Sequence, residues 1–134
     1  MPKRFAAIVL CAAAALAGCG SSSSGSGTNA TRPGPPSRAV FVHGLILECR
    51  QGNAAIAAAH GNSAKVASII TSYLPKFKAL TTTGASEVTY RKFLATIEAE
   101  LAALRTGNAT ALKAAQTAGE KYAQELGAPA CAGK

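Results

Sequence analysis

Two glycine–asparagine pairs enclose the stretch that decides the fold: residues 61–108 read GNSAKVASIITSYLPKFKALTTTGASEVTYRKFLATIEAELAALRTGN. A glycine after one helix and an asparagine before the next are common stop and start signals. Inside the stretch, residues 83–86 (TGAS) supply a further turn, with Ser86 as the expected cap. The stretch therefore predicts two helices, over residues 64–82 and from Ser86 to about Arg105.

Apolar side chains in these two segments recur in steps of three and four residues. One seam consists of Val66, Ile70, Tyr73, Phe77 and Leu80, and the other of Tyr90, Leu94, Ile97, Leu101 and Leu104. Such seams are typical of helices that bury one face in a bundle. Pro75 lies inside the first seam and is expected to kink that helix.

The flanking segments predict two more helices. Ser37 follows two prolines and begins a helix over residues 38–60, and Asn108 begins one that Gly127 and Pro129 end. In the first of these helices, residues 39–47 (AVFVHGLIL) also fit a short strand. The apolar pattern continues through residue 56, however, and favours a helix. Since the linkers are short, we expect an all-α antiparallel four-helix bundle over residues 37–134.

The N-terminus carries the pattern of an export signal. Lys3 and Arg4 precede 13 mostly apolar residues, which span about 20 Å as a helix and are too short for a ~30 Å hydrocarbon core. The segment ends Leu16-Ala17-Gly18-Cys19, which resembles the lipobox of bacterial lipoproteins, where the signal is cleaved and the Cys thiol is lipidated. The resemblance implies a signal peptide over residues 1–18 and a diacylglyceryl (and palmitate) anchor on Cys19. An ordinary secretory signal with a chance Cys is the alternative.

Residues 20–36, GSSSSGSGTNATRPGPP, have no side chains that can build a core. We expect them to form, with Cys19, a disordered flexible tether over 19–36 with an average span of about 20–25 Å. The protein is therefore predicted to reside at the extracytoplasmic face of the cell membrane.

The four cysteines divide by position. Cys11 leaves with the signal and Cys19 takes the lipid, which leaves Cys49 and Cys131 in an exported, oxidising setting. A disulfide is favoured over two free thiols there, and it closes a loop of roughly 80 residues, worth about 4.5 kcal/mol in the chain-entropy account.

Two loose motifs carry a resemblance over residues 45–131. They are Cys49, Asn53 and Ile56 in the first helix, and Ala123, Leu126, Gly127 and Cys131 near the end. The region resembles a group of small, mostly uncharacterised helical lipoproteins of GC-rich bacteria. The resemblance implies a disulfide-closed helical domain and no known activity.

Groups for acid–base or metal chemistry are scarce, because the chain has no Asp, two His and six Glu. His43 and His60 would lie about 25 Å apart on one helix. Glu98 and Glu100 point about 200° apart, so no paired-acid mechanism follows. We therefore predict no catalytic residues, no metal site and no cofactor, and expect that the protein is not an enzyme.

The charge is more informative. Residues 37–134 contain 11 Lys and Arg against 6 Glu. Lys76, Lys78, Arg91 and Lys92 flank the central turn, with Glu87 nearby. We hypothesise that this end binds anionic lipid or another anionic envelope polymer; a solvated set of charges is the alternative. Because the protein is exported and has no groove-reading motif, nucleic acid is not an expected partner.

Three functions fit these observations. The first is a non-catalytic envelope binding or interaction module that takes an anionic surface or a protein partner. The second is a structural or assembly accessory that self-associates through the start of the first helix, Val40, Phe41, Val42, Leu45 and Ile46. The third is a small-ligand carrier, or an enzyme, with a cavity between Ala-lined helices, which a deep pocket with convergent polar groups would favour.

Overall fold

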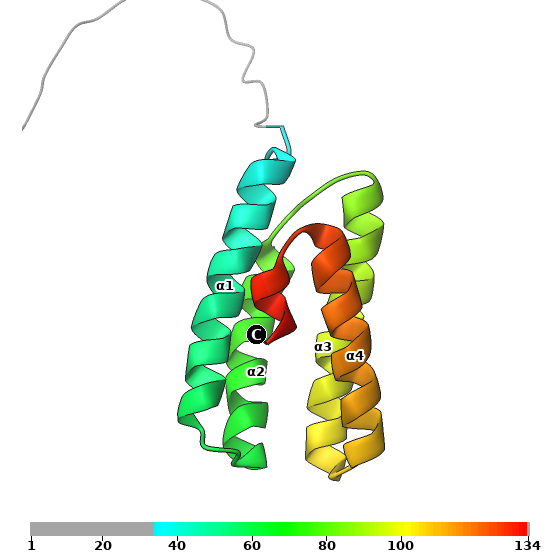
Figure 1. Cartoon of the computed structure of the whole chain (residues 1–134). Coiled ribbons are helices and arrows are strands. Elements are labelled where there is room, and N and C mark those ends of the chain that lie inside the picture. Colours follow the sequence, from blue (N-terminus) through cyan, green and yellow to red (C-terminus); the bar gives the residue numbers. More distant parts are fainter. Residues whose placement is uncertain (1–33, 134) are drawn as a thin grey trace, which may run out of the picture. The chain divides into compact units, whose positions relative to one another are not determined.

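A computed structural model describes residues 34–133 of the 134-residue chain. The elements are α1 (Arg38–Ala58), α2 (Ser63–Ala79), α3 (Ala85–Thr106), α4 (Ala109–Leu126) and a short 3-10 helix, η1 (Pro129–Ala132). Consecutive helices run antiparallel, and no strand occurs among the described residues (Figure 1). The prediction of an all-α four-helix arrangement is confirmed.

The helix ends follow the expected chemistry with one exception. The Asn62 and Asn108 side chains each accept a hydrogen bond at 2.9 Å from the backbone N–H three residues ahead. Gly127 ends α4 in the left-handed region at φ 79°, so that the N–H of Ala128 can donate back to the helix. The prediction that Ser86 caps α3 is wrong: α3 starts after Gly84, and no side chain caps it.

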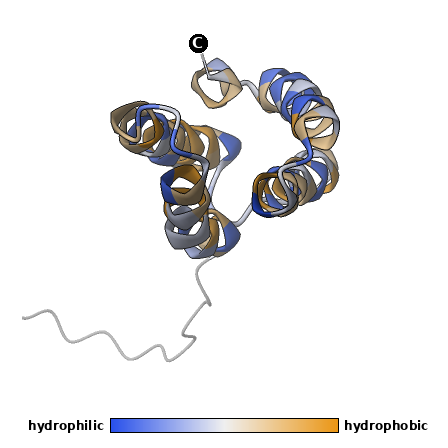
Figure 2. Ribbon diagram, turned by 90° about the horizontal axis from the view of Figure 1, so that it is seen from below, coloured by the Kyte–Doolittle hydropathy of each residue, from blue (hydrophilic) through white to orange (hydrophobic). Residues whose placement is uncertain are grey.

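The C-terminal segment stands between the first and last helices. α1 packs on α2, α2 on α3 and α3 on α4, whereas η1 packs on both α1 and α4. Viewed along the helices, α1 to α4 follow an arc and η1 lies at its open side (Figure 2). The Cys49–Cys131 disulfide fixes η1 against α1, with a Cα–Cα distance of 4.9 Å, so the predicted bridge is confirmed.

Aromatic side chains fill the end of the bundle near the start of α1. Phe41 meets Tyr90 edge to face at 4.9 Å, Tyr90 and Phe93 are stacked, and the Tyr90 hydroxyl donates to the Phe77 carbonyl oxygen at 2.6 Å. Burial, and next the nearby Glu48 carboxylate, raise the pKa of Tyr90 above its usual range. Phe41 and Leu45 are 2% and 0% exposed. These two members of the stretch expected to self-associate are therefore part of the core and cannot contact a second copy.

Candidate binding cavity

A cavity of about 350 Å³ lies among the four helices, and on α1 it is lined by residues 49–56. All four helices and η1 contribute to its lining. This volume is about that of a dozen water molecules, which suits a small organic molecule rather than a peptide. A pocket lined by both apolar and polar side chains is the kind of feature that the third function requires.

One wall of the cavity is apolar. Four of its side chains come from α2, two from α3 and one from α1, and we call it the apolar wall. Its members are Ile56, Ile69, Ile70, Tyr73, Phe77, Phe93 and Ile97. Tyr73 packs over Gly52, where a Cβ atom would lie 3.7 Å from its ring, so the glycine gives the ring room against α1. Such a surface can bury the apolar body of a ligand.

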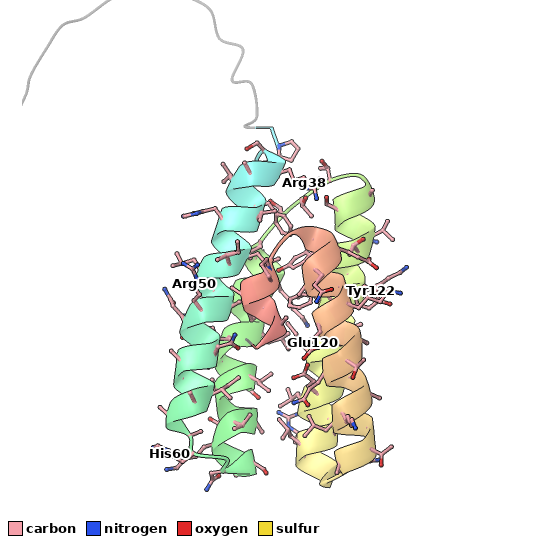
Figure 3. The ribbon with its side chains drawn as sticks, in the orientation of Figure 1. Arg38, Arg50, His60, Glu120 and Tyr122 are labelled. Carbon is pink, nitrogen blue, oxygen red and sulfur yellow. A yellow bond between two sulfur atoms is a disulfide. The ribbon has the colours of Figure 1, made fainter. Side chains whose placement is uncertain are left out.

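Polar side chains from α3 and α4 also line the cavity. Glu100 on α3 and Gln116 and Glu120 on α4 line it, and we call these three residues the acidic wall. Figure 3 shows Glu120 on the side of α4 that faces α1 and α2. No Lys, Arg or His from residues 34–133 lines the cavity.

Glycine brings the two helices of the acidic wall close together. A Cβ atom on Gly119 would come within 3.1 Å of Thr96 Oγ1 and 3.5 Å of Glu100 Oε1. The Glu100 side chain therefore lies against the backbone of α4, and its burial raises its pKa from 4.5 to about 7. A carboxyl group with such a pKa in a cavity is typical of a functional site.

The side chains of Glu98 and Glu100 point to different sides of α3, as predicted. The Glu98 carboxylate is half exposed and lies 2.7 Å from Lys78 Nζ, whereas Glu100 faces the cavity. Glu100 was not among the predicted site residues, although its position in the sequence carries a signal. Glu100 follows Ile97 by three residues and precedes Leu104 by four, so it occupies an apolar seam position with a carboxylate.

A disulfide and a hydrogen bond to α1 fix η1, which lines one side of the cavity. Cys131, Ala132 and Gly133 line the cavity from η1 and the residue after it. The Asn53 side-chain amide donates to the Ala130 carbonyl oxygen at 2.8 Å, beside the disulfide. Cys49, Asn53 and Ile56, which carried the first resemblance motif, all line the cavity.

The four predicted basic residues lie near one end of the domain but point toward different helices. Lys76 Nζ lies 4.0 Å from a Glu48 oxygen on α1, and Lys78 pairs with Glu98 on α3. Arg91 pairs with Glu87 within α3, and Lys92 Nζ lies 6.0 Å from the centre of the Tyr122 ring on α4. Three of the four cations therefore have a carboxylate beside them.

The remaining expectations concern metals and the membrane. His43 and His60 are both exposed, and His60 lies at the end of α1 opposite Arg38 (Figure 3). Within residues 34–133, no three His, Cys, Asp or Glu side chains gather where a metal ion could bind. Of the helices described, none has both the length and the apolar composition needed to cross a membrane. The predicted signal peptide, the predicted lipidation site Cys19 and the predicted tether up to residue 33 lie outside the described residues.

Comparison of the chain with protein-family models, with curated proteins and with solved structures finds no match.

Proposed function

We propose that the chain is a lipid-anchored lipoprotein of the cell envelope whose helical domain is a non-catalytic binding module for a small, mainly apolar molecule. The observation that carries the proposal is the cavity of about 350 Å³ between the apolar wall and the acidic wall. A largely apolar pocket with a few polar groups is the usual form of a small-molecule site.

The lining residues explain how such a site would bind a small molecule without catalysing a reaction. Contact with the isoleucine and phenylalanine side chains removes the apolar surface of the ligand from water, at about 25 cal/mol per Å². The polar groups of the acidic wall are two carboxylates and one amide, which bind and orient a ligand by hydrogen bonds. A ligand of about ten non-hydrogen atoms would bind with a Kd on the order of 0.1–1 mM.

The anchor places this module at the membrane. A lipid on Cys19 and the flexible residues that follow it would keep the domain within tens of ångströms of the bilayer surface. A binding module in this position has access to small molecules in the envelope. We also propose that Lys92 contacts anionic lipids or envelope polymers. Its ammonium group has no carboxylate within 4.0 Å among the described residues.

The cavity is tested by filling it. The full chain carrying Cys19→Ala is titrated with 4-phenylbutanol by calorimetry, and we expect saturable binding of one molecule. Ile69→Trp, which fills the cavity from α2, should abolish binding, whereas Val88→Trp on an exposed site of α3 should not. Absence of binding to the parent chain, or equal binding to the Ile69→Trp variant with its helical circular dichroism retained, would contradict the proposal.

The anchor is tested in cells. Cys19→Ala should abolish metabolic labelling with a palmitate analogue and should release the protein from the membrane fraction. Cys11→Ala serves as the matched control, because that residue lies inside the signal and should not affect labelling. Labelling that survives Cys19→Ala would refute the lipid assignment.

A further inference from the structure

We propose that the cavity selects an amphipathic cation: a ligand with an apolar body of about ten atoms and one amine or other cationic group, held by Glu100 and Glu120. This inference rests on the proposed binding function and adds the chemical class of the ligand. It is based on which glutamates have a Lys or Arg partner among residues 34–133 and which have none.

The six glutamates divide into two sets. Glu48, Glu87, Glu98 and Glu125 lie outside the cavity, and each has a Lys or Arg nitrogen within 4.0 Å. Glu100 and Glu120 line the cavity, and neither has such a partner among residues 34–133. Among residues 34–133, the two glutamates without a Lys or Arg nitrogen within 4.0 Å are therefore the two that a bound ligand would meet.

The charge distribution of the chain makes this arrangement unusual. The protein has 14 Lys and Arg against 6 acidic residues, yet the described lining of its cavity contains acidic side chains and no basic ones. A cavity with one sign of charge and apolar surroundings concentrates the field of that charge. A ligand carboxylate would be repelled there, and a cation would be attracted.

The position of Glu100 adds a reason of its own. A Cβ atom on Gly119 would lie 3.5 Å from Glu100 Oε1. The Glu100 carboxyl group is therefore packed between α3 and α4, beside the apolar wall. Burial raises the pKa of Glu100 to about 7 because the charged form loses hydration. An ammonium group in the cavity would replace that hydration with a charge-assisted hydrogen bond.

A matched set of probes separates the two proposals. 4-Phenylbutylamine, 4-phenylbutanol and 4-phenylbutyrate share one apolar body and differ in the end group. They are titrated into the Cys19→Ala chain at pH 8, where Glu100 is mainly ionised. The other titratable side chains of the lining are Glu120 on α4 and Tyr73 on α2. We expect the amine to bind on the order of tenfold more tightly than the alcohol, and the carboxylate to bind most weakly.

The outcomes are distinguishable. If the alcohol binds in the cavity and the amine binds no more tightly, the ligand class is wrong and the binding function stands. If none of the three binds, the binding function itself fails.

Variants then assign the selectivity to residues. Glu100→Gln keeps the shape of the side chain and should bring the amine within about twofold of the alcohol. Glu120→Gln should lower the amine preference by a smaller factor. Glu98→Gln, two residues away on the solvent side of the same helix, is the control and should retain the tenfold preference. Equal losses in the Glu98→Gln and Glu100→Gln variants would show a nonspecific charge effect and overturn the inference.

Discussion

The two halves of the domain use the same helices and differ in what fills the space between them. Near the start of α1, Phe41, Tyr90 and Phe93 pack edge to face or stacked around Leu45 and Leu126, which are 0% and 1% exposed. Beyond η1, α4 presents Ala115 and Gly119 as its buried residues, and a cavity remains. On α4, a leucine therefore helps to close the first half, whereas alanine and glycine leave room in the second.

The difference also concerns charge. The closed half buries one hydroxyl, that of Tyr90, and satisfies it with a backbone carbonyl. The open half places the Glu100 carboxyl against the apolar wall at a cost in hydration. The Tyr90 hydroxyl thus has a protein partner, whereas a buried Glu48 oxygen has no hydrogen-bond partner among residues 34–133 and lies 4.0 Å from Lys76 Nζ.

The largest effect is expected where η1 is fixed between the halves. Cys131→Ser removes a crosslink over 82 residues and should lower the free energy of unfolding by about 4 kcal/mol, since the unfolded chain regains its freedom. Urea denaturation of the Cys19→Ala chain measures this. Reductant should destabilise the parent similarly and leave the Cys49→Ser/Cys131→Ser variant unchanged; a loss below about 1 kcal/mol would contradict this role of the bridge.

A pair of truncations compares the two halves directly. Phe41→Ala opens a void in the closed half and should cost about 3–4 kcal/mol. Ile69→Ala enlarges a cavity that already exists, beside a partly exposed side chain, and should cost about 1 kcal/mol. Thermal and urea unfolding give both values. Equal costs would mean that the two halves are packed alike.

Glu100 should make stability depend on pH. Its pKa is raised from 4.5 to about 7 in the folded chain, so the folded state holds the proton more tightly and stability falls as the pH rises from about 4.5 to about 7. Glu100→Gln should therefore be more stable than the parent by on the order of 2–3 kcal/mol at pH 8, with no difference at pH 4. Unfolding by urea at both pH values checks the sign. A variant less stable than the parent at pH 8 would show that the carboxylate is satisfied by the protein.

The smallest effect is expected at the neighbouring glutamate. Glu98 and Lys78 are each about half exposed, at 50% and 52% of their side-chain surface. Glu98→Gln should change the free energy of unfolding by less than about 0.5 kcal/mol, because water screens exposed ion pairs. The same measurements at pH 8 test it, and a loss above 1 kcal/mol would show a structural role for this pair.

Most of the fold could be predicted from the sequence because local signals determine it. The Gly61-Asn62 and Gly107-Asn108 pairs place the turns through glycine conformation and side-chain capping, and the apolar spacing identifies the buried faces. The disulfide could be predicted because Cys49 and Cys131 are the two cysteines that remain if the chain is exported and lipidated as expected. At the start of α3 the local signal misled, since Gly84 turns the chain and Ser86 lies inside the first turn.

The cavity could not be predicted, because it depends on the sizes of side chains that meet from four helices. Spacing shows which face of α4 is buried, but it does not show that Gly119 will lie over Glu100 or that η1 will stop short of filling the centre. The insertion of η1 between α1 and α4 is likewise a tertiary result, set by the turn at Gly127 and the reach of Cys131. Glu100 alone carried a readable signal, as a carboxylate at an apolar seam position.

The most direct test of the account is to locate a bound probe. 4-Phenylbutylamine is titrated into the ¹⁵N-labelled Cys19→Ala chain, and the backbone amide signals of the glycines are followed by NMR. Gly52, Gly119 and Gly133 line the cavity, whereas Gly61, Gly84 and Gly107 lie at the turns. We expect saturable shifts of the first three signals and stationary signals for the other three. Shifts confined to the turns, or no saturable shift at any glycine, would contradict the claim that this cavity is a binding site.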